Sequence, residues 1–165
     1  YMKEELKDPK YAKMQLVTIV YGDDLRDKSY NEAMGLFKSY PNLKGIISPT
    51  TVGLSATAKA ITDAGLVGKV KLTGLGLPSE MAEWVHNGAC EAFFLWNPVD
   101  LGYLASYVAS LLCDGTITGK AGEEFSAGRM GNYTIVEAGD GGTEVLLGPP
   151  FRFDITNIDE WKDIY

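Results

Sequence analysis

The fold of this chain is decided by one stretch, Gly45-Ile46-Ile47-Ser48-Pro49-Thr50-Thr51-Val52-Gly53-Leu54-Ser55-Ala56-Thr57-Ala58. The stretch predicts a short buried strand over Gly45–Ser48, a tight polar turn, and a helix of small residues that begins near Thr51. In an open α/β sheet such a turn lies in the crevice beyond the carboxyl ends of the strands, where ligands bind. A hydroxyl of Thr50 or Thr51 can also accept from the first helical turn, so the turn could serve only as a helix cap.

Upstream of this stretch, the sequence predicts one more strand and one more helix. The run Met14–Val20 is almost continuously apolar and rich in β-branched residues, which is typical of a parallel strand covered on both faces. A helix is expected from about Asp27 or Ser29 to Tyr40, because Ser29 and Glu32 have the spacing of a capping box.

Downstream, strands and helices continue to alternate. Lys69–Thr73 and Ala92–Leu95 read as strands, and Pro78 suits the first turn of the helix between them. Asn97 suits the N-cap of a further helix, with Pro98 at its first position. This alternation predicts an α/β fold with a doubly wound, mostly parallel sheet and right-handed crossovers. Beyond residue 116 the pattern changes to short strand signals separated by glycines.

The composition describes a globular protein and excludes some partners. The chain has 165 residues, 45% apolar and 22% charged, and its length alone indicates one domain. Its net charge of −7 and pI near 4.7 argue against nucleic acid, which needs a basic surface. No basic cluster suggests an anionic membrane surface, and no apolar run is long enough to span a bilayer.

The sequence offers no catalytic set, metal site or cofactor motif. Cys90 and Cys113 lack metal-ligand spacing, and we expect two buried thiols rather than a disulfide. The sole histidine, His86, precedes Cys90 by four residues, but two ligands alone do not make a metal centre. Gly74-Leu75-Gly76 lacks the third glycine of a dinucleotide fingerprint. We therefore predict that the chain is not an enzyme.

A row of strand-end loops supplies the candidate site. The loops are Tyr21–Asp23, Pro49–Thr51, Gly76–Pro78 and Trp96–Asn97. Parallel strands share a direction, so these loops should lie along one edge of the sheet. Their amide, hydroxyl, backbone and aromatic groups suit a neutral polyol. Capping alone would also explain Asn97, and core packing would also explain Trp96.

These loops belong to segments that resemble a known family over almost the whole chain. The segments are Gly45–Gly53 (GIISPTTVG), Thr73–Met81 (TGLGLPSEM), Leu95–Tyr103 (LWNPVDLGY), Ala127–Gly131 (AGRMG) and Asp154–Ile158 (DITNI). The sequence resembles the C-terminal lobe of periplasmic sugar-binding proteins of the ribose-binding type (type I). Within that class it is most similar to the rhamnose-binding and autoinducer-2-binding proteins.

The resemblance implies a two-lobed protein that closes on its ligand by a hinge and delivers it to the membrane permease of an ABC importer. It implies sugar contacts, which would fall at Pro49, Thr50, Thr51, Gly76, Leu77 and Asn97. The autoinducer-binding relatives have an acidic residue where this chain has Thr50. That difference, and Asn rather than Asp at position 97, favours a neutral deoxysugar such as rhamnose. No cofactor is implied.

The resemblance also implies that the chain is a fragment. Residues 1–7 form a charged helical pattern without a start signal, as at the end of a helix that began earlier. We expect residues 1–165 to be the C-terminal lobe, and 98–150 to include segments that cross to or pack on an N-terminal lobe. Without that lobe, the apolar stripe of the helix Pro98–Asp114 could be covered by a second copy, giving a homodimer.

Two other readings stay open at this point. The same fold serves as the effector-sensing domain of LacI-type transcriptional repressors, and an autoinducer-2 receptor would share its architecture. Transport places the protein in the periplasm or on the outer face of the cell membrane, where a lipid could anchor it. A secretion signal in the full gene product would favour transport, and a DNA-binding helix-turn-helix would favour regulation.

Overall fold

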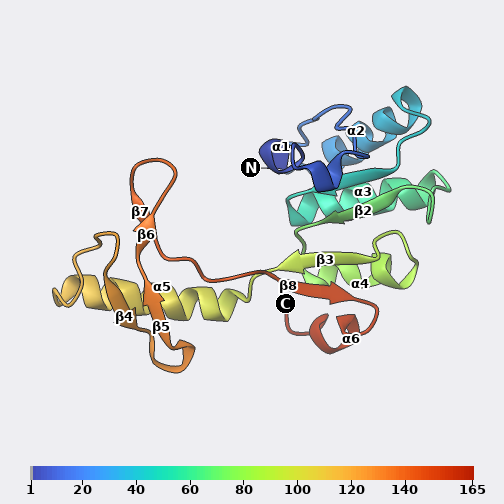
Figure 1. Cartoon of the computed structure of the whole chain (residues 1–165). Coiled ribbons are helices and arrows are strands. Elements are labelled where there is room, and N and C mark those ends of the chain that lie inside the picture. The colour runs from blue at the N-terminus through green and yellow to red at the C-terminus, as the bar shows by residue number, and fades with distance from the viewer. Residues whose placement is uncertain (1) are drawn as a thin grey trace. The chain divides into compact units, whose positions relative to one another are not determined.

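The computed structural model describes residues 2–165 and divides the chain into two compact units (Figure 1). The first unit comprises the residues up to Ala92 together with Asp154–Tyr165, and the second comprises Phe93–Phe153. Length alone had indicated one domain. Each unit has its own elements and is described separately.

The first unit contains a parallel strand pair packed against helices. Its elements are α1 (Met2–Glu5), the 3-10 turn η1 (Pro9–Tyr11), α2 (Arg26–Ser39), β1 (Gly45–Ser48), α3 (Thr51–Asp63), β2 (Lys71–Gly74), α4 (Pro78–His86) and α6 (Ile158–Trp161). β1 and β2 run parallel, with Gly45 opposite Lys71 and Ser48 opposite Gly74. α3 packs against both strands and against α2 and α4 (Figure 1).

α3 can pack in this central position because its residues are small or apolar. Leu54, Ala58 and Ile61 are completely buried, and Met81 of α4 is buried with them. Thr57 is also buried, and its hydroxyl donates to the carbonyl oxygen of Gly53 over 2.7 Å, which satisfies that polar group inside the helix. The helix ends at Asp63, and Gly65 follows with φ +66°, a left-handed conformation that glycine adopts readily after a helix.

The carboxyl ends of β1 and β2 approach each other unusually closely. A methyl group added to Gly74 would lie 1.7 Å from the carbonyl oxygen of Ser48, so no other residue fits without moving the backbone. Just beyond, the Leu75 N–H donates to the same Ser48 oxygen over 3.1 Å. These contacts fix where the loops after the two strands begin.

The predicted strand over Met14–Val20 is wrong. In the structure this apolar segment is extended coil, and no backbone hydrogen bond joins residues 15–21 to any other described residue. Its side chains are also exposed, to 50% at Leu16 and 45% at Ile19. The sequence pattern describes a strand, but a strand needs a neighbour to pair with, and none lies beside this segment in the described part of the chain.

The start of α2 also differs from the prediction. The helix begins at Arg26 after Leu25, which provides no side-chain cap, and the predicted cap residue Ser29 is instead buried inside the helix. The other boundaries agree better. Pro78 occupies the first turn of α4, and Asn97 and Pro98 open α5. β2 begins at Lys71 rather than Lys69.

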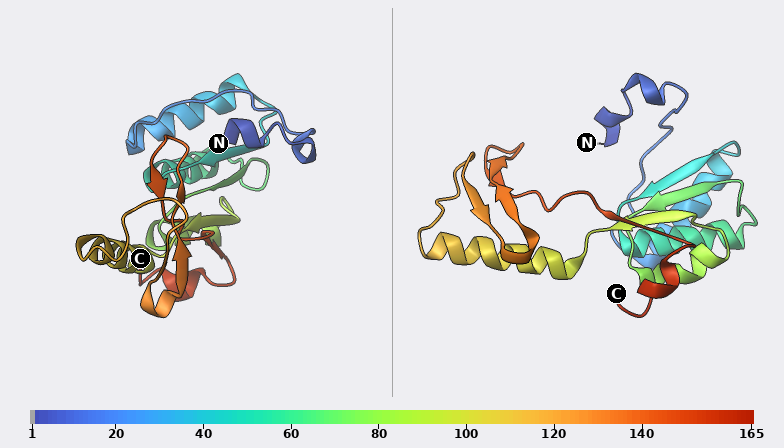
Figure 2. Two further views of the ribbon diagram at one scale, coloured as in Figure 1. Left: turned by 60° about the vertical axis from the view of Figure 1, so that its left-hand side comes forward. Right: turned by 60° about the horizontal axis from the view of Figure 1, so that its bottom comes forward.

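The second unit is a long helix with hairpins beside it (Figure 2). Its elements are α5 (Pro98–Cys113), β4 (Glu124–Ser126), the 3-10 turn η2 (Gly128–Met130), β5 (Asn132–Thr134), β6 (Val136–Glu137) and β7 (Thr143–Glu144). β4 pairs with β5 and β6 with β7, both antiparallel. Leu104 of α5 packs with Ile117, Phe125 and Ile135 to form the core of this unit.

One further strand pair lies where the chain passes from one unit to the other. β3 (Ala92–Leu95) pairs with β8 (Phe151–Asp154), and the rings of Phe93 and Phe153 stack with centroids 5.2 Å apart. Both rings are almost fully buried. The boundary between the units falls at the first residue of β3 and the last residue of β8.

The two cysteines occupy different environments, which corrects the expectation of two buried thiols. Both are free, but Cys90 is buried and Cys113, at the end of α5, is exposed. Burial raises the pKa of the Cys90 thiol to about 12, because the thiolate would be poorly solvated there. The exposed position of Cys113 follows from its place at the solvent end of a helix of which only Leu104 is buried.

This difference predicts selective thiol chemistry. In the native chain at pH 8, Ellman's reagent should modify Cys113 within minutes and leave Cys90 unmodified, because only the accessible thiolate reacts. The C113S variant should therefore titrate no thiol until denaturant is added. Rapid modification of native C113S would show that Cys90 is not buried.

In the loop after α5, one carboxylate organises several backbone groups. Glu123 accepts hydrogen bonds from the Thr118 hydroxyl at 2.7 Å and from the N–H groups of Thr118, Gly119 and Lys120 at 2.8, 2.9 and 3.1 Å. These donors, led by the Thr118 side chain, lower the pKa of Glu123 because they favour its charged form. The carboxylate thus holds the turn that leads into β4.

The loop should therefore loosen in acid. A carboxylate with a lowered folded-state pKa stabilises above its unfolded pKa, about 4.3, and loses that effect as the pH falls through the folded value. E123Q should reduce the hydrogen-exchange protection of the Gly119 and Lys120 amides at pH 7, with little difference from wild type at about pH 2. The matched control is E124Q, at an exposed neighbour. Equal protection in E123Q and wild type at pH 7 would contradict this role.

Candidate functional site

The turn between β1 and α3 holds three of the predicted site residues, Pro49, Thr50 and Thr51. Thr50 is the N-cap of α3, and its Oγ1 accepts from the Gly53 N–H over 3.1 Å. Pro49 and Thr50 are exposed, and Thr51 is half-buried. The turn is therefore rigid, because the cap holds it, and it is open to solvent.

Gly76 and Leu77, the next predicted pair, lie beside this turn. β1 and β2 are parallel and in register at their ends, and the Leu75 N–H bonds to the Ser48 carbonyl, so both loops leave the sheet at one edge. Leu77 is the N-cap of α4 but has no side-chain cap bond, and its carbonyl accepts from the N–H groups of Glu80 and Met81. The structure thus brings together five of the six predicted residues.

The loop before α2 reaches the same edge although the strand before it is absent. A methyl group on Gly22 would lie 2.1 Å from Ser29 Oγ, and one on Gly53 would lie 3.8 Å from the same oxygen. Ser29 therefore lies between the 21–24 loop and the first turn of α3. Three of the four predicted loops share one edge of the first unit.

Sequence reasoning missed a polar cluster that ties the helices of this edge together. Arg26 of α2 donates to Ser55 Oγ of α3 over 3.2 Å and forms a 3.0 Å ion pair with Glu80 of α4. The indole N–H of Trp84 donates to the same Ser55 oxygen over 3.3 Å. No local motif could reveal these contacts, because they join residues that are 29 and 54 positions apart.

Asn97, the sixth predicted residue, belongs to the second unit, so its relation to the five others stays a prediction. Its Oδ1 accepts from the N–H groups of Val99 at 2.9 Å and Asp100 at 3.2 Å, which confirms that it caps α5. Asp100 in turn pairs with Arg129 at 2.6 Å, and the guanidinium lies 4.5 Å from the centre of the Tyr103 ring. Asn97 is thus held on a helix end that a second segment braces.

Trp96 is neither a core residue nor fully exposed. Its side chain is 38% exposed, and its indole N–H donates to the Gly148 carbonyl over 2.7 Å. The indole N–H is thus used within the protein, while part of the ring remains accessible. An accessible aromatic face of this kind can cover the C–H side of a sugar.

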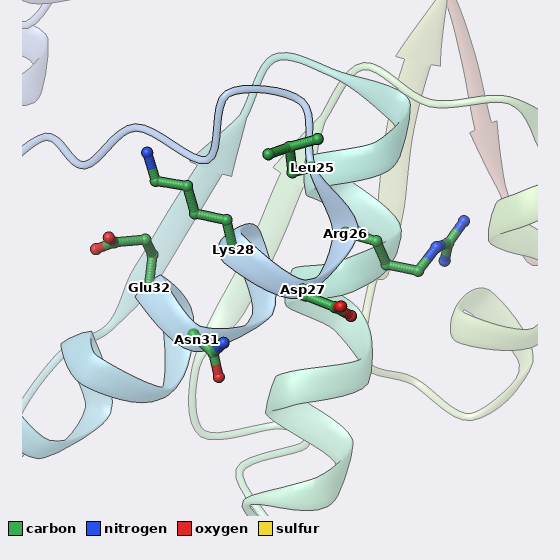
Figure 3. Close-up of a pocket in the computed structure, with 6 residues that line it drawn as sticks. All are labelled: Leu25, Arg26, Asp27, Lys28, Asn31 and Glu32. Carbon is green, nitrogen blue, oxygen red and sulfur yellow. The ribbon is translucent and has the colours of Figure 1, made fainter.

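A surface hollow of about 510 Å³ lies along the start of α2 and shares Arg26 with the polar cluster. It is lined by Leu25, Arg26, Asp27, Lys28, Asn31 and Glu32. Figure 3 shows that Arg26 and Lys28 extend to opposite sides and that Asn31 points away from both. Because these side chains do not converge and none is a predicted site residue, we do not assign a ligand to this hollow.

Some other kinds of site find no support in the described residues. Residues 2–165 contain no group of three or more His, Cys, Asp or Glu side chains placed to hold a metal ion. Within the same range, no helix has the length and apolar character needed to cross a bilayer.

Comparison with known proteins identifies the architecture. Residues 1–117 match a protein family described as periplasmic binding protein domain. The chain belongs to this family. Its fold is that of the type I members, which confirms the predicted α/β fold class. The family comprises binding proteins rather than enzymes, in agreement with the second prediction.

Several solved structures are similar to this chain, and two of them come from ABC transporters. One is an ABC transporter solute-binding protein from Clostridium phytofermentas with bound L-rhamnose, 46% identical over 99% of this chain, with a TM-score of 0.91. Another is a sugar ABC transporter protein from Actinomyces odontolyticus, 45% identical over 97% of the chain, TM-score 0.83. LsrB from Clostridium saccharobutylicum, in complex with AI-2, has a TM-score of 0.82 over 96% of the chain but only 20% identity, and so shows the shared fold alone.

The chain spans about half the length of these relatives. The matched part covers 54% of the Clostridium phytofermentas protein, 50% of the Actinomyces odontolyticus protein and 52% of LsrB. The function of a whole binding protein is therefore only proposed for this chain.

The Thr50 cap predicts a measurable loss of stability. T50A removes the acceptor for the Gly53 N–H and should lower the free energy of unfolding by about 1 kcal/mol, within the usual range for a lost N-cap. T50S keeps a hydroxyl and should lose much less. Urea denaturation followed by far-UV circular dichroism measures both, and equal losses in the two variants would contradict the capping role.

Proposed function

We propose that this chain is the C-terminal lobe of an extracytoplasmic solute-binding protein that captures a sugar and delivers it to an ABC importer. The observation that carries the proposal is the likeness to the rhamnose-bound relative, at 46% identity over 99% of the chain. The converging loops of the first unit support it, because they place rigid polar groups at the sheet edge where such folds bind ligands.

The chemistry of the edge favours a neutral ligand. The predicted contact residues Pro49, Thr50, Thr51, Gly76 and Leu77 carry no charge, and the nearby Arg26 and Glu80 neutralise each other in an ion pair. Hydroxyl and backbone groups suit sugar hydroxyls, and apolar Pro and Leu side chains suit a methyl group. A deoxysugar such as L-rhamnose combines both features.

An autoinducer-2 receptor is the second candidate. The likeness to LsrB supports only the fold, and the uncharged Thr50 turn offers AI-2 no acidic partner. The proposed permease partner and the extracytoplasmic location follow from the family and from the transporter relatives. A regulatory role in a LacI-type repressor has no comparable relative among those described above, and no observation favours a homodimer.

The proposal predicts that this chain holds about half of a binding site. Calorimetry with L-rhamnose should give no measurable heat for the 165-residue chain. Joined to the portion of the Clostridium phytofermentas relative that the match does not cover, the chain should bind L-rhamnose at least 100-fold more tightly, because several hydrogen bonds worth about 1 kcal/mol each are added. AI-2 should not compete.

Within that joined protein, T51V should weaken binding about tenfold, since one hydrogen bond to the sugar is lost. The matched control is T62V, which removes a hydroxyl from the same helix, where Thr62 donates to the Ala58 carbonyl. Tight L-rhamnose binding by the chain alone, or equal effects of the two variants, would refute the assigned half-site. Tighter binding of AI-2 than of L-rhamnose would refute the sugar.

A further inference from the structure

Two helices that start at predicted sugar contacts begin with the same local pattern. Leu77-Pro78-Ser79-Glu80 opens α4, and Asn97-Pro98-Val99-Asp100 opens α5. In each, the N-cap is the predicted contact, proline follows at the first helical position, and an acidic residue stands at the third. Proline is well suited to that position, and an acid in the first turn interacts favourably with the positive end of the helix dipole. Local helix chemistry therefore explains both acids.

In both helices an arginine from a distant segment pairs with that acid. Arg26 of α2 lies 3.0 Å from Glu80, and Arg129 of η2 lies 2.6 Å from Asp100. The partners are 54 and 29 positions apart in the sequence, so helix chemistry alone does not explain the arginines. The sequence contains three arginines, and two of them form these contacts. The pairing is thus a repeated feature of the helix starts that carry the predicted contacts.

The turn that carries Arg129 is fitted closely to α5. The guanidinium lies 4.5 Å from the centre of the Tyr103 ring, and the Arg129 backbone N–H donates to the Tyr103 hydroxyl in a long bond of 3.4 Å. The preceding residue, Gly128, has φ +55°, and a methyl group there would lie 2.6 Å from the Tyr103 hydroxyl and 2.5 Å from that of Tyr107. Backbone contacts as well as the ion pair therefore determine how Arg129 approaches Asp100.

Asp100 connects this turn to Asn97. The Asp100 N–H donates to Asn97 Oδ1 over 3.2 Å, beside the 2.9 Å bond from the Val99 N–H. Asp100 thus bonds to Asn97 through its backbone and to Arg129 through its carboxylate. The orientation of the Asn97 amide group depends on where the first turn of α5 lies, and Arg129 holds that turn. An exposed ion pair adds little to overall stability, so its effect should fall on this orientation rather than on folding.

We propose that Arg129 is a positioning residue for ligand binding, which acts through Asp100 on the helix start that presents Asn97. The inference rests on the proposed function, because Asn97 is a predicted sugar contact. Arg129 also neutralises the Asp100 carboxylate, so this helix start presents no net charge, as the start of α4 does through Arg26 and Glu80. A neutral ligand is suited to both helix starts for the same reason.

A double-variant cycle tests the coupling in the protein joined to the uncovered portion of the Clostridium phytofermentas relative. R129M should weaken L-rhamnose binding about fivefold, and N97S, which keeps a capping oxygen but removes the amide, about tenfold. Because Arg129 acts through Asn97, the double variant should bind no more weakly than N97S alone. The matched control is K120M, which removes a charge from an exposed side chain of the same unit and should bind like wild type. Additive losses, or unchanged binding in R129M, would overturn the proposal.

Hydrogen exchange in the 165-residue chain separates this inference from the proposed function. In R129M the amides of Val99 and Asp100 should exchange at least about threefold faster than in wild type, and in K120M at the wild-type rate. If the joined wild-type protein binds no L-rhamnose, the proposed sugar is wrong and exchange alone decides: faster exchange in R129M supports the positioning role, and unchanged exchange overturns it. Circular dichroism checks folding, and D100N, which removes the same ion pair, replaces R129M if that variant is unfolded.

Discussion

The close contact between the ends of β1 and β2 is the constraint on which the candidate site depends. Gly74 comes so near to the Ser48 carbonyl that a side chain is excluded, and the following N–H, that of Leu75, bonds to the same oxygen. Because the strands end together, the Pro49–Thr51 turn and the Gly76–Leu77 loop leave the sheet side by side. Two loops that are 25 positions apart in the sequence, counted from Thr51 to Gly76, therefore lie at the same edge of the sheet.

The helices α2, α3 and α4 of the first unit pack together and stabilise that edge. α3 approaches the strands through small residues, and its first turn is fixed by Thr50. Arg26 then joins α2 to α3 and α4 through Ser55 and Glu80. These side chains form hydrogen bonds and an ion pair with one another, so the polar groups of the loops stay available to a ligand. Such preformed, uncharged edges suit the binding of neutral polar molecules.

Most local features of the fold could be predicted from the sequence, although the capping box expected at Ser29 does not start α2. Features that need distant partners could not be predicted. The caps at Thr50 and Asn97 and the helix start at Pro78 are confirmed, because capping involves residues within four positions of each other. Met14–Val20 was predicted wrongly, because a strand exists only when another strand pairs with it. The exposure of Cys113 and the Arg26 cluster likewise depend on which segments pack together. Five of the six candidate residues could be placed at one edge from strand direction alone, and the position of Asn97 relative to them remains a prediction.

The cap on α3 also determines which hydrogen bonds the Thr50 hydroxyl can still form with a ligand. A threonine hydroxyl has one proton to donate and oxygen lone pairs to accept with, and Thr50 uses one of those lone pairs for the Gly53 N–H. It keeps its proton to donate and a second lone pair to accept with. If a ligand binds at this turn, a hydroxyl group can match Thr50 as donor or acceptor and a ring oxygen can match it as acceptor, whereas a C–H group can do neither.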